Sequence, residues 1–322
     1  MKRLAFTTYT GLTTAGLALI TAVLLTDWQE SVASEVFWHI LWQLQLPLVI
    51  TAILVGAVLA VSAASLQVVL HNPLADPGII GISSGASLVA AGLLIVQPIQ
   101  LAQGAPYLLP LGCFIGALLS TWLIYLVARR LRGAAMAVIL AGIAISTVSG
   151  ALMAWLYVLA DAQALRNLTF WLMGSLYQTD WMILSVAGPV MLGSVVYQCW
   201  QSRQLNWLYG GETLAAAAGV TPEKLIKKTL LASALGVGAA VSVAGSIAFI
   251  GLLVPHFLRL VIGYNNRALL PACALCGAVV LLAVATLTEY LHLITLPVSM
   301  ITATVGGPLL LLALYRGQWK VA

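Results

Sequence analysis

Charged side chains are scarce in this 322-residue chain. Asp, Glu, Lys and Arg make up 7% of the residues, whereas hydrophobic residues make up 62%. A soluble domain usually carries about 25% charged residues, so the composition excludes that class. It predicts an all-α membrane protein with many spans, because helices satisfy their own backbone groups in lipid. The net charge of +5 comes from residues scattered along the chain without a basic stripe, so nucleic acid is not an expected partner.

Nucleotide-binding and catalytic patterns are missing as well. The chain has no Gly-x-x-x-x-Gly-Lys loop and no Gly-Lys pair at all, so we do not expect it to bind ATP. The four histidines are far apart, and Cys273 and Cys276 are flanked by Ala and Leu, which favours core residues over a metal site. We therefore predict a transport protein that is not an enzyme and has no cofactor or metal of its own.

Ionisable residues are rare inside the predicted spans, where Glu289 and Arg259 lie nearest to the apolar runs. Ion-coupled carriers and cation pores generally keep such residues at mid-membrane. The sequence therefore disfavours an ion-coupled secondary transporter, which stays as the alternative of another class.

Ten apolar runs approach the roughly 20 residues that one crossing needs. They cover residues 10–26, 46–70, 79–96, 106–128, 135–159, 181–200, 227–244, 247–263, 268–290 and 297–315. With a cytoplasmic N-terminus, 13 of the 14 Lys and Arg residues fall on the inside and only Arg166 falls outside. This sorting follows the positive-inside rule and predicts that both termini are cytoplasmic.

A polar, turn-forming stretch separates the second and third runs. It reads His71-Asn72-Pro73-Leu-Ala-Asp76-Pro77-Gly78, and Gly81-Ile-Ser-Ser-Gly85 follows. Each proline fixes its own φ and disfavours helix in the residue before it, so the chain must bend here. From turn chemistry alone the stretch is an ordinary loop between membrane helices, and the predicted topology puts it on the cytoplasmic side.

This stretch resembles the motif after the second helix of the FecCD-type permeases, the membrane subunits of type II ABC importers for iron-siderophores, haem and cobalamin. Two further runs are similar to that family and occur in family order. They are Gly245-Ser-Ile-Ala-Phe-Ile-Gly-Leu-Leu-Val-Pro-His-Phe-Leu-Arg259 and Thr302-Ala-Thr-Val-Gly-Gly-Pro308. The resemblance implies a ten-helix permease fold, formed by residues 1–322 as a single domain.

The longest cytoplasmic connection, residues 201–226, contains a predicted short helix over 212–218. Gly210 and Gly211 break the structure before it, Glu212 lies in its first turn and Gly219 follows its end. Mere packing is one interpretation. The resemblance implies the other, a coupling helix against an ATPase subunit, with candidate residues Gly211, Glu212, Thr213, Leu214, Ala217 and Gly219.

Small and weakly polar residues recur every four positions in the fifth span, at Gly142, Ser146, Gly150 and Ala154. Such stripes commonly pack helices closely, but they also suit a path for a bulky solute. Both interpretations stay open. The resemblance implies that the fifth and last helices line a path at a dimer interface, which gives as candidates Gly142, Ser146, Ser149, Gly150, Met153, Thr302 and Gly306.

The sequence departs from the family at three outside positions. Family members usually carry arginines that pair with glutamates of a periplasmic binding protein, whereas this chain has Gln45, Leu48 and Thr288 there. Docking through other contacts, such as the acidic segment after the first helix, and pairing with a permease chain that retains the arginines are two open hypotheses.

The resemblance implies a permease of the bacterial inner membrane that works with ATPase subunits, a periplasmic binding protein and a second permease chain. ATP would be bound by the ATPase subunits, and the two permease chains could form a homodimer or a heterodimer. The expected solute is an iron-siderophore, with haem or cobalamin as the alternatives.

Overall fold

The computed structural model describes residues 2–25, 34–96, 107–130, 135–290 and 296–315, and these contain helices but no strand. The helices are α1 (Lys2–Leu25), α2 (Ser34–Ile40), α3 (Leu46–Val69), α4 (Ile82–Val96), α6 (Leu108–Arg130), α7 (Ala135–Leu159), α8 (Ala162–Met173), α9 (Trp181–Trp200), α10 (Ser202–Tyr209), α11 (Glu212–Ala217), α12 (Pro222–Ala244), α13 (Ile250–Ile262), α14 (Asn266–Tyr290) and α15 (Val298–Tyr315). Leu41–Gln45 joins α2 to α3 as a π-helical turn.

Ten of the described helical segments match the ten predicted spans. Seven are long and apolar enough to cross a membrane, and α4, α13 and residues 298–312 of α15 are shorter apolar helices. The all-α prediction is confirmed. Three of the described helices were not predicted: α2, before the second span, α8, in the connection after the fifth span, and α10, directly after α9.

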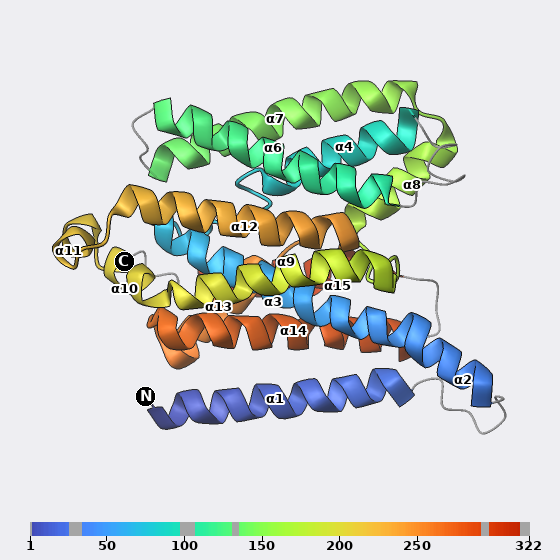
Figure 1. Cartoon of the computed structure of the whole chain (residues 1–322), viewed down its shortest axis with the longest axis horizontal. Helices are drawn as coiled ribbons and strands as arrows, with labels where there is room; N and C mark the ends of the chain where they lie inside the picture. Colours follow the sequence, from blue (N-terminus) through green and yellow to red (C-terminus); the bar gives the residue numbers. More distant parts are fainter. Residues whose placement is uncertain (1, 26–33, 97–106, 131–134, 291–295, 316–322) are drawn as a thin grey trace.

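The long helices lie side by side with α3 at the centre of the bundle. Figure 1 shows α1 at one edge beside α14, and α7 at the opposite edge beside α6. Most of α3 is buried, and a Cβ on its Gly56 would overlap the backbone of Gly277 in α14. These two glycines therefore allow the closest approach of the two helices, as small residues do in membrane bundles.

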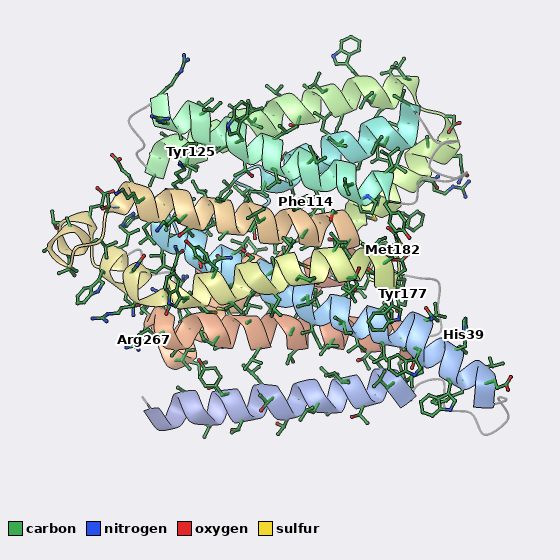
Figure 2. The ribbon with its side chains drawn as sticks, in the orientation of Figure 1. His39, Phe114, Tyr125, Tyr177, Met182 and Arg267 are labelled. Carbon is green, nitrogen blue, oxygen red and sulfur yellow. The ribbon has the colours of Figure 1, made fainter. Side chains whose placement is uncertain are left out.

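The two ends of the bundle differ in the residues they carry. The start of α1, α10 and α11 lie at one end, and α2 and α8 lie at the other (Figure 1). Figure 2 shows Arg267 at the first end and His39 and Tyr177 at the second. At the second end Asp161 and Asp180 cap α8 and α9, because each carboxylate accepts a backbone N–H of the first turn at 2.7 Å.

Two helices, α4 and α13, begin inside the bundle. They contain 15 and 13 residues, which correspond to about 22 and 20 Å at 1.5 Å per residue, less than a bilayer core of about 30 Å. Gly81 and Phe249, directly before them, have φ of 96° and 71°. Irregular chain at this depth is tolerated where it is buried in protein or lines a cavity.

Candidate functional site

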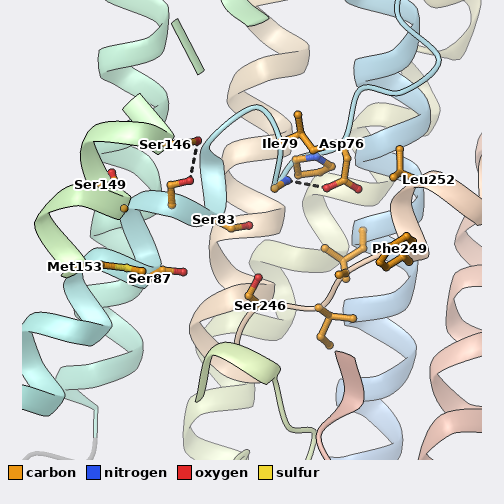
Figure 3. Close-up of a pocket in the computed structure, with 17 residues that line it drawn as sticks. Asp76, Ile79, Ser83, Ser87, Ser146, Ser149, Met153, Ser246, Phe249 and Leu252 are labelled. Atoms are coloured by element: carbon orange, nitrogen blue, oxygen red, sulfur yellow. Dashed lines mark hydrogen bonds between the residues drawn. The ribbon is translucent and has the colours of Figure 1, made fainter. Parts of the chain in front are cut away.

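A cavity of about 430 Å³ lies where α4 and α13 begin (Figure 3). Its wall is formed by Leu59 of α3, residues 76–79, the first turns of α4, residues 146–153 of α7 and residues 246–252. Leu59 and residues 146–153 are near the middle of their helices. The cavity is therefore at mid-depth of the bundle.

The cavity wall is weakly polar. Six serines contribute to it, together with apolar side chains that include Met153 and Phe249, and the wall residues are Leu59, Asp76, Pro77, Gly78, Ile79, Ser83, Ser84, Ser87, Ser146, Ser149, Gly150, Met153, Ser246, Ile247, Ala248, Phe249 and Leu252. Ser84 donates to Ser146 across the α4–α7 contact at 2.9 Å. Ser87 and Ser149 are 8% and 5% exposed, and within the described part of the chain their hydroxyls have no hydrogen-bond partner. A buried hydroxyl gains when water or a solute supplies a partner.

The turn predicted for residues 71–78 is confirmed, and its last residues reach the cavity. Asn72 accepts the N–H of Leu74 at 2.9 Å, and Asp76 accepts that of Gly78 at 2.8 Å. His71 and Leu74 are exposed and Ala75 is buried, and the last part of the stretch, residues 76–78, borders the mid-depth cavity. The two side chains satisfy local N–H groups of the turn, which lets the chain fold back from the exposed residues toward the cavity.

Among the residues that the structure describes, Asp76 is the one ionisable side chain in the cavity wall. Its carboxylate touches the first turn of α13, where a Cβ on Gly251 would overlap it. A carboxylate is favoured near a helix N-terminus, where the backbone dipoles carry partial positive charge. Asp76 lies between the predicted spans of residues 46–70 and 79–96, so the prediction that ionisable residues are rare inside the spans did not include this cavity carboxylate.

The structure brings together four of the seven path candidates, Ser146, Ser149, Gly150 and Met153. The other three, Gly142, Thr302 and Gly306, lie outside the cavity wall and are packed against neighbouring residues of the bundle.

A Cβ on Gly142 would overlap the carbonyl of Ile80, and one on Gly306 would lie 2.8 Å from Phe249. Thr302 is buried, and its hydroxyl donates to the carbonyl of Ser299 at 3.4 Å. Close packing therefore holds at Gly142, whereas Ser146 and Gly150 of the stripe border the cavity, and their role in a translocation path stays a prediction.

Sequence reasoning missed the cavity serines outside α7. Ser83 and Ser84 lie in the family-like Gly81–Gly85 stretch, which signalled a motif but not a cavity. Ser87 and Ser246 had no local signal, because their role depends on which helices meet there.

The short helix predicted after Gly211 is confirmed, with its end one residue earlier than expected. Gly211 and Gly219 have φ of 109° and 79°, which glycine adopts without strain. The N–H groups of Gly219 and Val220 donate to the carbonyls of Ala216 and Ala215 at 3.0 and 2.9 Å, a Schellman ending. The side chains of Glu212, Thr213, Leu214 and Ala217 are exposed, so one face of α11 is available to a partner.

The three positions that lack the arginines expected from the resemblance are buried. Gln45, Leu48 and Thr288 are 5%, 4% and 7% exposed. The hydroxyl of Tyr177 donates to that of Thr288 at 2.9 Å. Burial raises the pKa of Tyr177 to about 12, so this donor keeps its proton at neutral pH. In this chain the three positions therefore contribute to packing.

Comparison with known proteins identifies the family. The model of the FecCD transport family matches residues 4–316. The chain belongs to the FecCD transport family. It is similar to the hemin transport system permease protein HmuU of Yersinia pestis, with 42% identity over 293 residues that cover 90% of this chain and 87% of that protein. The vitamin B12 import system permease protein BtuC of Vibrio cholerae is 39% identical over 285 residues, which cover 87% of this chain and 84% of that protein.

A solved structure has the same fold. It is described as an inward-facing conformation of a metal-chelate type ABC transporter, and it matches with a TM-score of 0.86 and 28% identity over 98% of this chain and 100% of that chain. The chain is thus a permease of the ABC-importer type with a transport role. The resemblance noted in the sequence is confirmed over nearly the whole length.

Proposed function

We propose that this FecCD permease imports a metal tetrapyrrole of the haem or cobalamin type through the mid-depth cavity. The carrying observation is the family match over residues 4–316, joined to a cavity built by four of the predicted path residues. The relatives named above are hemin and vitamin B12 permeases, which favours a tetrapyrrole over the expected iron-siderophore. The siderophore remains the competing substrate class.

The chemistry of the cavity wall suits a bulky and largely apolar solute. Apolar residues such as Ile79, Leu252 and Phe249 supply surface for a flat ring, and the unpartnered hydroxyls of Ser87 and Ser149 supply hydrogen bonds. Ligand sites commonly combine such apolar walls with a few placed polar groups. A chelated metal needs no protein ligand, and the described residues contain no cluster of three His, Cys, Asp or Glu side chains.

Energy would come from a separate ATPase subunit that contacts the exposed face of α11. Movement of α11 would pass through α10 and α12 to the helices around the cavity. A periplasmic binding protein would deliver the solute at the end that carries α2 and α8, and the opposite end, with both termini, would be cytoplasmic. The residues 1–322 would act as one permease domain in the bacterial inner membrane.

Reconstitution into liposomes with its ATPase and binding protein tests this proposal. We expect ATP-dependent uptake of haem or cobalamin, and none with an ATPase that cannot hydrolyse ATP. Uptake of a ferric siderophore without uptake of haem or cobalamin would show that the siderophores are the substrate class instead. Solute flux that proceeds without ATP would overturn the importer and return an ion-coupled carrier to consideration.

The coupling role of α11 has its own test. Gly219→Ala places a side chain at a φ of 79° and should weaken the helix ending by about 1 kcal/mol. We expect reduced ATP hydrolysis in response to the binding protein, with less ATPase subunit bound. Gly193→Ala, in a helical position with open space around it, is the matched control. Equal effects of the two variants would contradict the coupling role.

A further inference from the structure

A second hollow, of about 490 Å³, lies at the end of the bundle that carries α10 and α11. Its wall comes from α10, from Leu214 of α11 and from the turn between α13 and α14, including Tyr264 and Asn265. No residue of the mid-depth cavity belongs to it. The hollow shares Leu214 with the face of α11 proposed above to contact an ATPase subunit, whereas its other wall residues lie outside α11.

Hydrogen bonds and ring stacking hold the walls of the hollow together. Asn206 donates from its amide to Asn265 at 2.8 Å and accepts the N–H of Asn266 at 2.7 Å. The rings of Tyr209 and Tyr264 stack with centroids 5.6 Å apart and an angle of 21°. The two sides of the hollow are therefore fixed relative to each other before any ligand binds.

Two arginines from different elements contribute to the wall. Arg203 belongs to α10 and Arg267 to α14, and both are exposed. Among the described residues neither guanidinium forms an ion pair, and Arg267 uses only its backbone N–H in a hydrogen bond, to Asn265. Two unpaired guanidiniums beside one hollow suit a phosphate group, which arginine binds in a bidentate manner.

The depth of the hollow matches the headgroup region of a bilayer. Arg203 follows the last residue of α9 by three positions, and Arg267 is the second residue of α14. Both helices are long and apolar enough to span a membrane. Trp207 and Tyr264, 37% and 44% exposed, add the aromatic side chains that are enriched at membrane interfaces.

From these observations we infer that the hollow binds the phosphate-bearing headgroup of an anionic phospholipid. Basic pockets between membrane helices bind such headgroups. An acidic segment of a partner protein could also bind the two arginines. The aromatic residues and the position of the hollow at the helix ends favour a lipid. Because Leu214 lies in the wall, a bound lipid would tie the coupling segment to the α13–α14 turn.

Native mass spectrometry of the purified full-length permease with its bound subunits tests the lipid. The protein is taken from nanodiscs of phosphatidylethanolamine with phosphatidylglycerol. We expect the wild type to retain phosphatidylglycerol, and Arg203→Gln with Arg267→Gln to lower that retention at least tenfold. The control is Lys224→Gln with Lys228→Gln, which removes the same charge from another hollow at the same end. It should retain the lipid like the wild type.

Three outcomes would overturn the inference. The first is equal loss of lipid in the control, and the second is no loss in either variant. The third is unchanged lipid retention with loss of the co-purifying ATPase subunit, which would assign the hollow to an acidic segment of that subunit.

Two measurements separate lipid binding from folding and from free phosphate. In neutral detergent without phosphatidylglycerol, the arginine variant should unfold at the wild-type temperature. Short-chain phosphatidylglycerol should raise the unfolding temperature of the wild type only. An equal rise with inorganic phosphate at the same concentration would overturn the assignment to a lipid.

Discussion

Two glycines on the same face of α7 have different surroundings. Gly142 touches the carbonyl of Ile80, whereas Gly150 has open space around its Cα and lines the cavity. The spacing in the sequence predicts the shared face but not this difference. The difference arises because residues 76–81 fold back against the first half of α7 only, and no local pattern encodes that contact.

Alanine substitutions should separate these two glycines. Gly142→Ala forces the α7 backbone away from Ile80, and overpacking of this kind costs about 1–3 kcal/mol. The methyl group added by Gly150→Ala meets no atom, and alanine has a higher helix propensity than glycine. The unfolding temperature of this variant in detergent should therefore equal or exceed that of the wild type. Comparison of the two thermal unfolding curves checks this prediction. A loss of stability at Gly150 as large as that at Gly142 would show that both glycines pack.

Asp76 combines a structural hydrogen bond with a charge, and two substitutions distinguish them. Asp76→Asn keeps an oxygen that can accept the Gly78 N–H, whereas Asp76→Ala leaves that N–H without its partner. We expect Asp76→Ala to lose about 1–3 kcal/mol of stability and Asp76→Asn to lose less than 1 kcal/mol. Denaturant unfolding of both variants measures this. If Asp76→Asn is as unstable as Asp76→Ala, the charge and not the hydrogen bond holds the turn.

At the scale of elements, α13 is tied to α3 by polar side chains. Arg259 in its last turn donates to the side-chain oxygen of Gln67 and, at 3.5 Å, to the carbonyl of Ala64. The amide of Gln67 donates to the carbonyl of Gly251 in the first turn, also at 3.5 Å. A single glutamine of α3 thus contacts both ends of α13.

A double-mutant cycle between Gln67 and Arg259 should show this connection. We expect Gln67→Ala and Arg259→Ala each to lower stability, and the two together to cost less than their sum, with a coupling of about 0.5–3 kcal/mol. The readout is the free energy of unfolding in detergent. Additive effects would show that Arg259 holds α13 through other contacts.

The success of element prediction depended on length and composition. Long apolar runs gave the ten spans, since about 20 apolar residues have few alternatives to a membrane helix. The helix α10 was missed because its eight residues carry polar side chains and follow α9 after one residue. The early starts proposed for α4 and α13 came from apolar residues that border the cavity in irregular chain, where hydropathy is the same but the backbone is not helical.

At the scale of the whole molecule, α15 is little buried, and eight of its sixteen residues with described side chains are exposed. Only Val298, Thr302 and Gly306 are buried, a stripe with a spacing of four. On α7, Gly150 is both exposed and part of the cavity wall, so the cavity opens beside that helix. A polar cavity open to acyl chains would leave hydroxyl groups without partners, which is costly in lipid. A second permease chain against α7 and α15 would close it.

The intact complex should therefore contain two permease chains. For a homodimer, native mass spectrometry should detect two copies of the 33.9 kDa chain, a C2 pair being the commonest assembly. A second permease of different mass would establish the heterodimer instead. A single permease chain in an active complex would refute the dimer and the closure of the cavity.

The late starts of α4 and α13 change where the backbone is most accessible. In an ordinary span the central amides are the most protected from hydrogen exchange, because the helix ladder and the lipid both shield them. Here residues 246–249 belong to no helix and border a cavity at mid-depth. We therefore expect amides at the centre of this bundle to exchange early, apart from that of Ala248, which donates to Ser299, so that the pattern of exchange along the chain would be reversed relative to depth.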